Sequence, residues 1–298
     1  MHVYADNAAT TRVSRAAIKA MEPFWEEVYG NPSSLHTGEI YFTWGGSEAD
    51  NQAILSAAQW GAKNGKKHIV STKFEHHGVL HVLNKLEKQG YEITLLDVHR
   101  DGVVKPEEVA AAIRPDTALV TVMFANNEIG TTQPIAEKGV FFHTDAVQAA
   151  GHVPLDVKAL QVDLLSLSAH KFHGPKGVGA LYCRKGAPLF THIVGGAQEK
   201  GKRAGTENLP GIAGMAAALG DACAHMEENA SKIAALRDRL IEGLSPIPHS
   251  VLNGDRENRL PGIVNFCFEG VEGESLLLLL NEQGIKASSG SACTSGTL

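Results

Sequence analysis

A lysine and an aspartate each follow an apolar stretch of this 298-residue chain, in positions where they could do chemistry together. Lys171 comes just after the segment LLSLS (164–168), between His170 and a Gly-Pro turn. Desolvation of a lysine amine at the floor of a cleft favours its neutral form, which can make a Schiff base with a carbonyl compound. A lysine in a loop is more often simply solvated, so Lys171 alone does not decide the chemistry.

Asp145 lies at the end of a second apolar segment, VFFHTDA (140–146). A carboxylate at this position either caps the next helix or pairs with a cation. The pyridinium nitrogen of pyridoxal phosphate (PLP) is such a cation, and aspartate is its usual partner. One strand ending in aspartate and the next ending in lysine therefore favours a PLP site over two unrelated structural roles.

The elements that would position these groups follow an alternating pattern. Short, apolar, β-rich segments alternate with amphipathic helical ones, which predicts an α/β fold with a mainly parallel central sheet buried on both faces. The predicted strands are 40–43, 68–72, 91–98, 118–125, 140–146, 164–168 and 179–183, and the predicted helices between them are 47–64 and 77–90.

The pattern changes near residues 210–245, where one long alanine-rich helix is expected over 210–243. A shorter β-α-β unit is expected beyond it. This change predicts a second, smaller α/β domain. The predicted unit comprises a strand at 262–268, a helix at 272–283 and a strand at 285–289, and the predicted domains are a large one of residues 15–210 and a small one of residues 1–14 plus 211–298.

Polar segments follow five of the predicted strands, at the edge where ligands bind in such sheets. Gly45, Gly46 and Ser47 open a helix, and the backbone N–H groups of a helix N-terminus suit a phosphate. A Gly-Gly-Ser loop is also an ordinary helix cap, so the argument depends on the five segments together. They are TWGGSEADN (43–51), FEHHGVL (74–80), ANNEIG (125–130), HTDAVQ (143–148) and SAHKFHGPKG (168–177).

Composition argues against several other classes of protein. The net charge is −6, from 27 basic and 33 acidic residues without long runs of one sign, which disfavours nucleic-acid and membrane surfaces as partners. Neither a spanning apolar stretch nor a secretion signal is evident. The four cysteines, at 183, 223, 267 and 293, have neither zinc spacing nor close pairs, which predicts reduced thiols in a cytoplasmic protein.

A series of motifs in one order, running from residue 3 to the last residue, resembles the cysteine desulfurases. The resemblance is to the nitrogen-fixation and housekeeping iron–sulfur type, within the class V aminotransferase-like PLP enzymes of fold type I. The motifs are DNAATT (6–11), GNPSSLH (30–36), GGSEADN (45–51), EHH (75–77), NNEIG (126–130), HTDAVQ (143–148), SAHKFHGPKG (168–177), RAGTEN (203–208) and SSGSACTSG (288–296).

The resemblance implies PLP as the cofactor and assigns roles around its ring. Lys171 would carry the cofactor as a Schiff base and, once released, transfer protons. Asp145 would pair with the pyridine nitrogen, and Gln148 would hydrogen-bond the ring hydroxyl. His76 would stack on the ring and help to move protons, whereas His77 would face elsewhere.

The resemblance also implies a phosphate site and a substrate contact. Asn127 would lie beside the ring and bind the substrate carboxylate. Thr206 would reach the phosphate from a partner subunit, which implies a homodimer. Within the subunit, the residues expected to hold the phosphate are Gly46, Ser47, Ser168 and His170.

Cys293 lies among small residues in SSGSACTSG, which leaves its loop unable to pack and able to swing. The matching cysteine of the family attacks the sulfur of L-cysteine and becomes a persulfide, while alanine leaves. The sulfur is then passed to an iron–sulfur scaffold protein or another acceptor, and Cys293 could transiently ligate a cluster during transfer. Cys183, Cys223 and Cys267 lie in strand or helix patterns and are expected to be inert core residues.

Three departures from the family pattern stand out. The segment SSLHTGEIYFT (33–43) enters a strand where a long helix is usual, and QPIAEKGVFFHTD (133–145) lacks most of a crossover helix. The family also continues beyond the position of Leu298, into a part that carries the arginine that binds the substrate carboxylate. We expect residues to be missing near 38–39 and 135–140 rather than a truly shortened protein, because a lost helix would expose apolar sheet surface.

Other interpretations stay open at this point. A selenocysteine lyase would use the same machinery. Another class V PLP enzyme, such as an aminotransferase, would not need the thiol of Cys293. A non-catalytic partner in iron–sulfur assembly would keep the fold but would not need Lys171.

Overall fold

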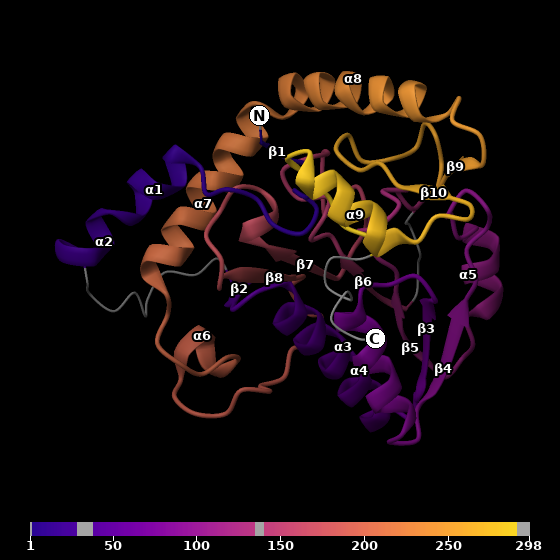
Figure 1. The fold of residues 1–298 in the computed structure, drawn as a ribbon. Helices are drawn as coiled ribbons and strands as arrows, with labels where there is room; N and C mark the ends of the chain where they lie inside the picture. The colour runs from indigo at the N-terminus through magenta and orange to yellow at the C-terminus, as the bar shows by residue number, and fades with distance from the viewer. Residues whose placement is uncertain (1, 29–37, 135–139, 291–298) are drawn as a thin grey trace.

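The computed structural model describes residues 2–28, 38–134 and 140–290 of the chain, and its centre is a seven-stranded sheet (Figure 1). The strand order is β2-β8-β7-β6-β5-β3-β4. Neighbours from β4 to β7 run parallel, whereas β8 is antiparallel to both β7 and β2. The strands are β2 (Ile40–Thr43), β3 (His68–Thr72), β4 (Glu92–Leu96), β5 (Thr117–Thr121), β6 (Phe141–Asp145), β7 (Leu164–Ser168) and β8 (Gly179–Cys183).

This arrangement confirms the predicted α/β class and its mainly parallel sheet, and all seven predicted strands of the sheet form. Successive residues of a strand point to opposite faces, so Ile69 and Leu119 pack against helices on one face while Val70 and Val120 pack on the other. The helices on the first face are α3 (Gly46–Lys63) and α4 (His77–Glu87), close to their predicted ranges. Because both faces are covered, the central strands β3 and β5 are buried along their whole length.

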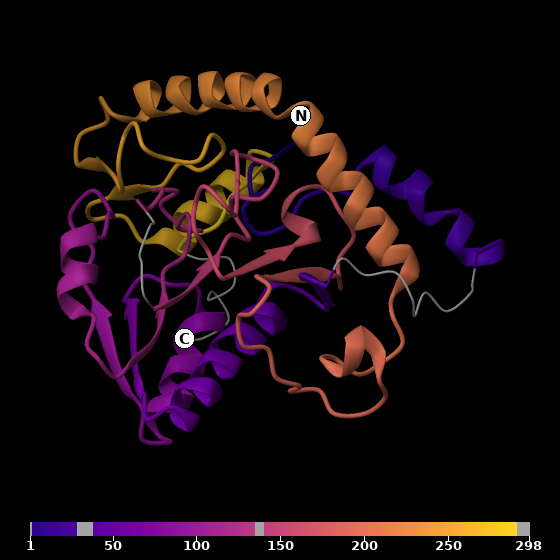
Figure 2. The ribbon, with the colours of Figure 1, turned by 180° about the vertical axis from the view of Figure 1, so that it is seen from behind.

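The predicted helix over 210–243 is wrong as a single element, because the structure has two helices there. Helix α7 (Leu209–Ala224) ends at His225, whose φ of −112° and ψ of 13° leave the helical range, and α8 (Met226–Leu244) starts anew. Met215 and Ala218 of α7 pack against Ala17 of α1 (Arg15–Met21). Helix α8 turns away across the top of the molecule in Figure 2, so one straight helix could not make both sets of contacts.

The predicted β-α-β unit is also wrong. Of residues 262–268 only β10 (Phe266–Phe268) forms, and it pairs antiparallel with β9 (Ser250–Leu252). Helix α9 (Gly273–Glu282) follows, and then β11 (Ile285–Lys286) pairs in parallel with β1 (Val3–Tyr4). The two expected partners therefore lie in different two-stranded sheets, because the chain's N-terminal end supplies the pairing edge for β11.

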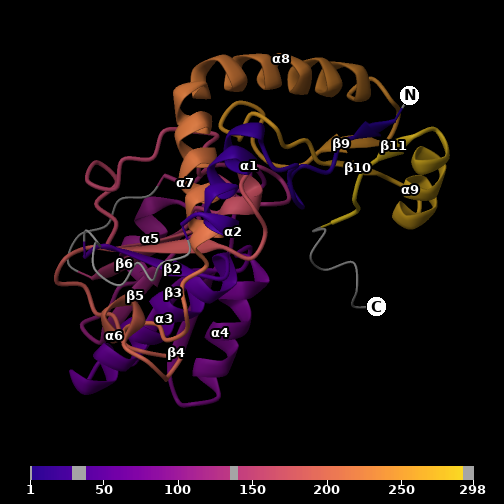
Figure 3. The ribbon, with the colours of Figure 1, turned by 90° about the vertical axis from the view of Figure 1, so that its left-hand side faces the viewer.

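These small sheets, together with α8 and α9, stand to one side of the central sheet in Figure 3. The division into residues 15–210 and residues 1–14 plus 211–298 stays a prediction. No helix in the described part of the chain is long and apolar enough to cross a membrane. The remaining elements are α2 (Pro23–Glu26), α5 (Pro106–Ala112), α6 (Gln198–Gly201) and a 3₁₀ turn, η1 (Ala169–Lys171).

The connection between β5 and β6 bears on the expected missing segments. These strands are parallel neighbours, and the described residues between them, 122–134 and 140, contain no helix. A cavity of about 600 Å³ lies beside this connection, lined in part by Trp60, Val140 and Phe141. The expected gap at 135–140 falls largely outside the described residues, as do residues 29–37 before the other expected gap.

We predict that truncating a side chain at the centre of the sheet destabilises the protein more than truncating one at its edge. Leu119 on β5 is 0% exposed, so Leu119→Ala should lower the free energy of unfolding by about 2–5 kcal/mol. The matched control is Leu95→Ala on β4, whose leucine is 39% exposed and should cost well under half as much. Urea unfolding of both variants checks this, and equal losses would contradict the assigned core.

Candidate active site

A cavity of about 260 Å³ opens where the predicted polar segments meet, at the carboxyl ends of β6 and β7. The structure therefore brings together residues that lie more than a hundred positions apart in the sequence. The predicted site residues that line it are Gly46, Ser47, His76, Asn127, Asp145, Gln148, Ser168, His170 and Lys171. Further lining comes from residues of the N-terminal segment and of the small sheets, including Ala5, Asp6, Ala8, Ile263, Asn265 and Ser288.

Lys171 lies at the floor of this cavity, in the 3₁₀ turn directly after β7. Its side chain is 7% exposed. Its Nζ donates hydrogen bonds to the backbone oxygens of Ala8 and Ala9, the second at 2.9 Å. Two carbonyl acceptors hold the amine in one place, and no motif in the sequence indicates that residues 8 and 9 would supply them.

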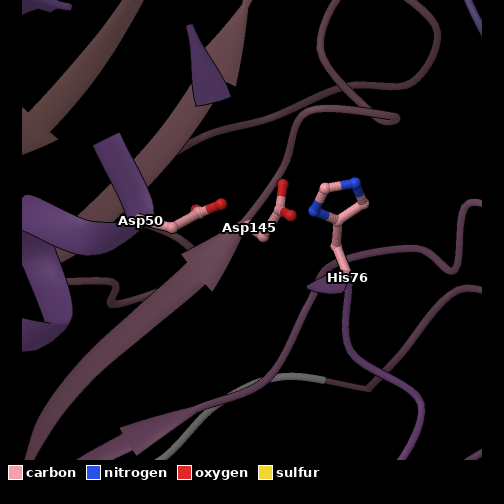
Figure 4. A group of neighbouring side chains, drawn as sticks. All are labelled: Asp50, His76 and Asp145. Atoms are coloured by element: carbon pink, nitrogen blue, oxygen red, sulfur yellow. The ribbon is translucent and has the colours of Figure 1, made fainter. Parts of the chain in front are cut away.

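Asp145 and His76 face each other across the cavity (Figure 4). Asp145 is the last residue of β6, and its Oδ1 accepts the N–H of Val147 at 2.9 Å. Burial raises the pKa of Asp145, while the Val147 N–H and the neighbouring His76 and Lys171 oppose the rise. Burial lowers the pKa of His76, so its imidazole is neutral near pH 7. Its Nδ1 accepts the N–H of Gly78 at 3.0 Å, which leaves Nε2 to carry the ring proton.

The residues predicted to hold a phosphate also lie together in the structure. Gly46 and Ser47 are the first residues of α3, and Ser168 and His170 flank the end of β7 opposite them. A Cβ at Gly46 would lie 2.6 Å from Cγ2 of Val147, so only glycine fits there. Burial and two nearby lysines lower the pKa of His170 to about 4, so it would meet an anion as a neutral donor.

Other predicted residues have mixed placements. Gln148 lines the cavity, and its Nε2 donates to the backbone oxygen of Ala8 at 3.0 Å. His77, the first residue of α4, instead lies beside His81, with ring centroids 5.3 Å apart and the rings tilted by 49°. Thr206 is exposed and does not line this subunit's cavity. None of the described residues that line the cavity is an arginine.

The cysteines need one correction. Cys183 is buried, and burial raises the pKa of its thiol to about 11, as an inert core residue requires. Cys223 and Cys267 are exposed, so the prediction that they are core residues is wrong. Both lie on elements at the surface, α7 and β10, where one side faces solvent. Cys293 lies outside the described residues.

Two buried carboxyl groups were not singled out from the sequence. Asp50 of α3 lines the cavity at 1% exposure, and Glu75 lies behind it at 5% exposure. Oε1 of Glu75 accepts from Thr72 Oγ1 at 2.6 Å and from the Met123 N–H at 3.0 Å. Burial raises the pKa of Glu75 to about 8 despite these bonds. Asp50 was detectable, because it lies one helical turn beyond Gly46 and therefore on the same face of α3.

Comparison with known proteins is decisive for the family. The family model for class V aminotransferases matches residues 36–297. A curated protein from Methanosarcina thermophila, named "Cysteine desulfurase IscS", is 51% identical over 99% of this chain and 81% of its own length. The chain belongs to the cysteine desulfurases of the class V aminotransferase family. A further cysteine desulfurase IscS, from Clostridium botulinum, is 48% identical over 99% of this chain and 83% of its own.

Solved structures confirm fold type I for this cysteine desulfurase family member. A protein titled "NifS-like protein" superposes with a TM-score of 0.92 at 37% identity, over 97% of this chain and 88% of its own. A structure titled "SspA in complex with cysteine" superposes with a TM-score of 0.82 at 31% identity, over 99% of this chain and 91% of its own. Proteins of this family depend on PLP, which agrees with the lysine and aspartate of the cavity.

The alignments also bear on the departures from the family pattern. The alignment with the Methanosarcina desulfurase extends over 327 positions, more than the 298 residues of this chain. Gaps must therefore be opened in this chain. Whether they fall near 38–39 and 135–140 stays a prediction.

Glu75 gives a pH-dependent prediction about stability. In the folded state Glu75 keeps its proton up to about pH 8, whereas in the unfolded chain it releases the proton near the ordinary pKa of 4.5. The contribution of protonated Glu75 to the free energy of unfolding is therefore complete below pH 4.5 and is lost as the pH rises towards 8. Relative to Glu75→Gln, the wild type should therefore lose about 1.4 kcal/mol of unfolding free energy per pH unit between about pH 5 and pH 8.

Urea unfolding of wild type and Glu75→Gln at both pH values measures this difference. The exposed Glu107→Gln on α5 is the matched control and should show no such trend. A wild-type advantage that is constant with pH would contradict a protonated Glu75.

Proposed function

We propose that this chain is a PLP-dependent cysteine desulfurase that converts L-cysteine to L-alanine and receives the sulfur on Cys293. The observation that carries the proposal is the joint burial of Lys171 and Asp145 in one cavity, with His76 between the β3 and α4 elements facing them. The identity of 51% to a curated cysteine desulfurase supports the same chemistry.

The residues present fit PLP. Lys171 offers the amine, Asp145 offers a buried carboxylate for the ring nitrogen, and Gly46 leaves room for a phosphate at the N-terminus of α3. When bound, PLP withdraws electrons from the bonds at the α-carbon of the amino acid that it carries. Ser47, Ser168 and His170 would hold the phosphate, and Gln148 would bind the ring hydroxyl.

The chain's own groups would divide the proton transfers. Lys171 Nζ is held by Ala8 and Ala9 close to the cavity floor, where it can take a proton from the substrate and return it. His76 is neutral near pH 7 and carries its proton on the nitrogen turned away from Gly78, so it can donate one. Asn127 would bind the substrate carboxylate.

The sulfur transfer step would use Cys293. Its thiolate attacks the sulfur of L-cysteine, so that an S–S bond forms and the C–S bond breaks. The electron pair of that bond goes to carbon, which takes up a proton and leaves as L-alanine. No outside oxidant is needed, because the carbon is reduced as the two sulfurs are oxidised.

The partners follow from the same reaction. L-cysteine is the proposed substrate, and the related SspA is described in complex with cysteine. A scaffold protein for iron–sulfur assembly is the proposed acceptor of the persulfide, with Cys293 as a transient cluster ligand. A homodimer is proposed because Thr206 is exposed here and would serve the other subunit. A cytoplasmic location stays a prediction.

The first prediction concerns Lys171. Lys171→Ala should abolish covalent attachment of PLP and lower alanine production from L-cysteine by at least about a thousandfold, because no other amine replaces the nucleophile. The measurement is alanine and sulfide release with PLP and a thiol reductant present, together with the absorbance of bound PLP. The control, Lys158→Ala, changes an exposed lysine outside this cavity and should match wild type.

Equal amounts of alanine and sulfide from wild type would support the proposal. Release of selenide from selenocysteine without turnover of L-cysteine would favour a selenocysteine lyase instead. Bound PLP without either product would favour a non-catalytic assembly partner.

The second prediction concerns the thiol. Cys293→Ser should keep the PLP absorbance of wild type and lose sulfide release by at least about a hundredfold, because serine cannot accept the sulfur. Cys223→Ser and Cys267→Ser are matched controls, since both remove exposed thiols and should leave sulfide release unchanged. Undiminished sulfide release by Cys293→Ser would contradict the persulfide step.

A further inference from the structure

Three buried carboxyl groups gather around the end of β6, more acidic groups than one cofactor nitrogen requires. Asp145 is 4% exposed, Asp50 is 1% exposed and Glu75 is 5% exposed. Glu75 has its own partners in Thr72 and Met123. Asp50 is the carboxyl whose purpose the proposed function does not yet explain.

Asp50 points at Asp145. One ligand atom each from Asp50, Asp145 and His76 lies within 4.8 Å of the others, and Figure 4 shows Asp145 between the other two. Oδ1 of Asp50 has no hydrogen-bond partner among the described residues, although it is buried. An unsatisfied buried oxygen on the wall of the cavity is costly unless its carboxyl group is neutral or something in the site uses its charge.

A chain of neutral groups holds Asp50 from behind. Its carboxyl is hydrogen-bonded to Ser166, whose Oγ lies 3.0 Å from Nε2 of His143, and Nδ1 of His143 lies 2.8 Å from Oγ1 of Thr121. Burial lowers the pKa of His143 to about 3, so the imidazole supplies no positive charge, although its Nε2 lies 3.6 Å from Asp50. This series of hydrogen bonds fixes the position of Asp50 without supplying a positive charge to offset its own.

The two carboxyls are unequal in their surroundings. Asp145 accepts the Val147 N–H and is stabilised as an anion by the nearby Lys171. The titratable groups that face Asp50 are Asp145, Glu75, His143 and His76, which are either acidic or neutral near pH 7. Two ionised carboxylates this close in a buried site repel each other, so the pair keeps one proton. The proton stays on Asp50, because fewer hydrogen bonds and positive charges stabilise its ionised form.

We propose that Asp50 is a positioning residue of the cofactor site, forming with Asp145 a carboxyl pair that holds one proton on Asp50 and presents one negative charge to the ring nitrogen. The inference rests on the proposed binding of PLP. When Asp145 is removed, Asp50 is placed to take over that negative charge.

The first test needs no cofactor. The infrared spectrum of the full chain at neutral pH should lose the carbonyl stretch of one protonated carboxylic acid when Asp50 is changed to Asn. Glu75→Gln is the matched control and should remove a second, separate acid band, since Glu75 has different partners. Loss of a carboxylate band instead in Asp50→Asn would show Asp50 ionised and would overturn the proposal.

The second test is a double-mutant cycle on the PLP-loaded protein, read as the Kd for PLP and as the midpoint pH of its absorbance. Asp50→Asn should change the Kd by less than about twofold in wild type but weaken it by at least about tenfold in Asp145→Asn, where Asp50 carries the charge. The midpoint pH should fall further in the double variant than in Asp145→Asn. Both substitutions are isosteric, and far-UV circular dichroism checks the fold.

The outcomes separate two failures. If Asp50 only shapes the cavity, Asp50→Asn will weaken PLP binding by the same factor in both backgrounds, and the carboxyl pair is wrong. If wild type keeps the acid band of Asp50 but does not bind PLP, the proposed cofactor is wrong while the protonated Asp50 stands.

Discussion

The parallel pairing of β6 with β7 is the constraint on which the site depends. Its register places Asp145 opposite Ser166, so the last residue of one strand lies beside a residue two positions before the end of the next. Ser166 then reaches Asp50, and the turn after Ser168 delivers Lys171. A slip of one residue would turn Asp145 and His143 to the other face of the sheet, which would take Asp145 out of the cavity and His143 away from Ser166.

Contacts from the far end of the chain complete what the sheet begins. The backbone oxygens of Ala8 and Ala9 accept from Lys171, Gln148 donates to the same Ala8 oxygen, and Thr11 Oγ1 donates to the backbone of His170 at 2.9 Å. These acceptors belong to a segment without regular structure, so its shape depends on the residues it touches. The lysine and the N-terminal segment therefore position each other, and neither is in place before the domain has folded.

The sequence predicted the sheet and the principal acid and lysine because apolar strands carry a strong local signal, and Asp145 and Lys171 end two of them. The errors have a common cause in contacts between distant parts of the chain. Residues 210–243 are continuously helix-forming, and only packing on two different surfaces splits them at His225. Glu75 looks like a surface residue of a loop, because nothing local records that its surroundings are buried, and Asp50 could be detected only from its spacing to Gly46 on α3. Cys223 and Cys267 lie in apolar patterns that predict burial, but both are exposed.

Helix α3 contributes to both ends of the cavity, and it makes the electrostatic potential differ between them. Its N-terminus, with Gly46 and Ser47, favours an anion through the helix dipole, while Asp50, one turn later, lies beside Asp145 at the acidic end. A cofactor with a phosphate at one end and a protonated nitrogen at the other is favoured in only one orientation. The reverse orientation would set a phosphate against buried carboxyls and a cation against the positive end of the dipole. In the favoured orientation the phosphate would face Gly46 and Ser47 and the ring nitrogen would face Asp145, so helix α3 would help to place the cofactor within reach of Lys171.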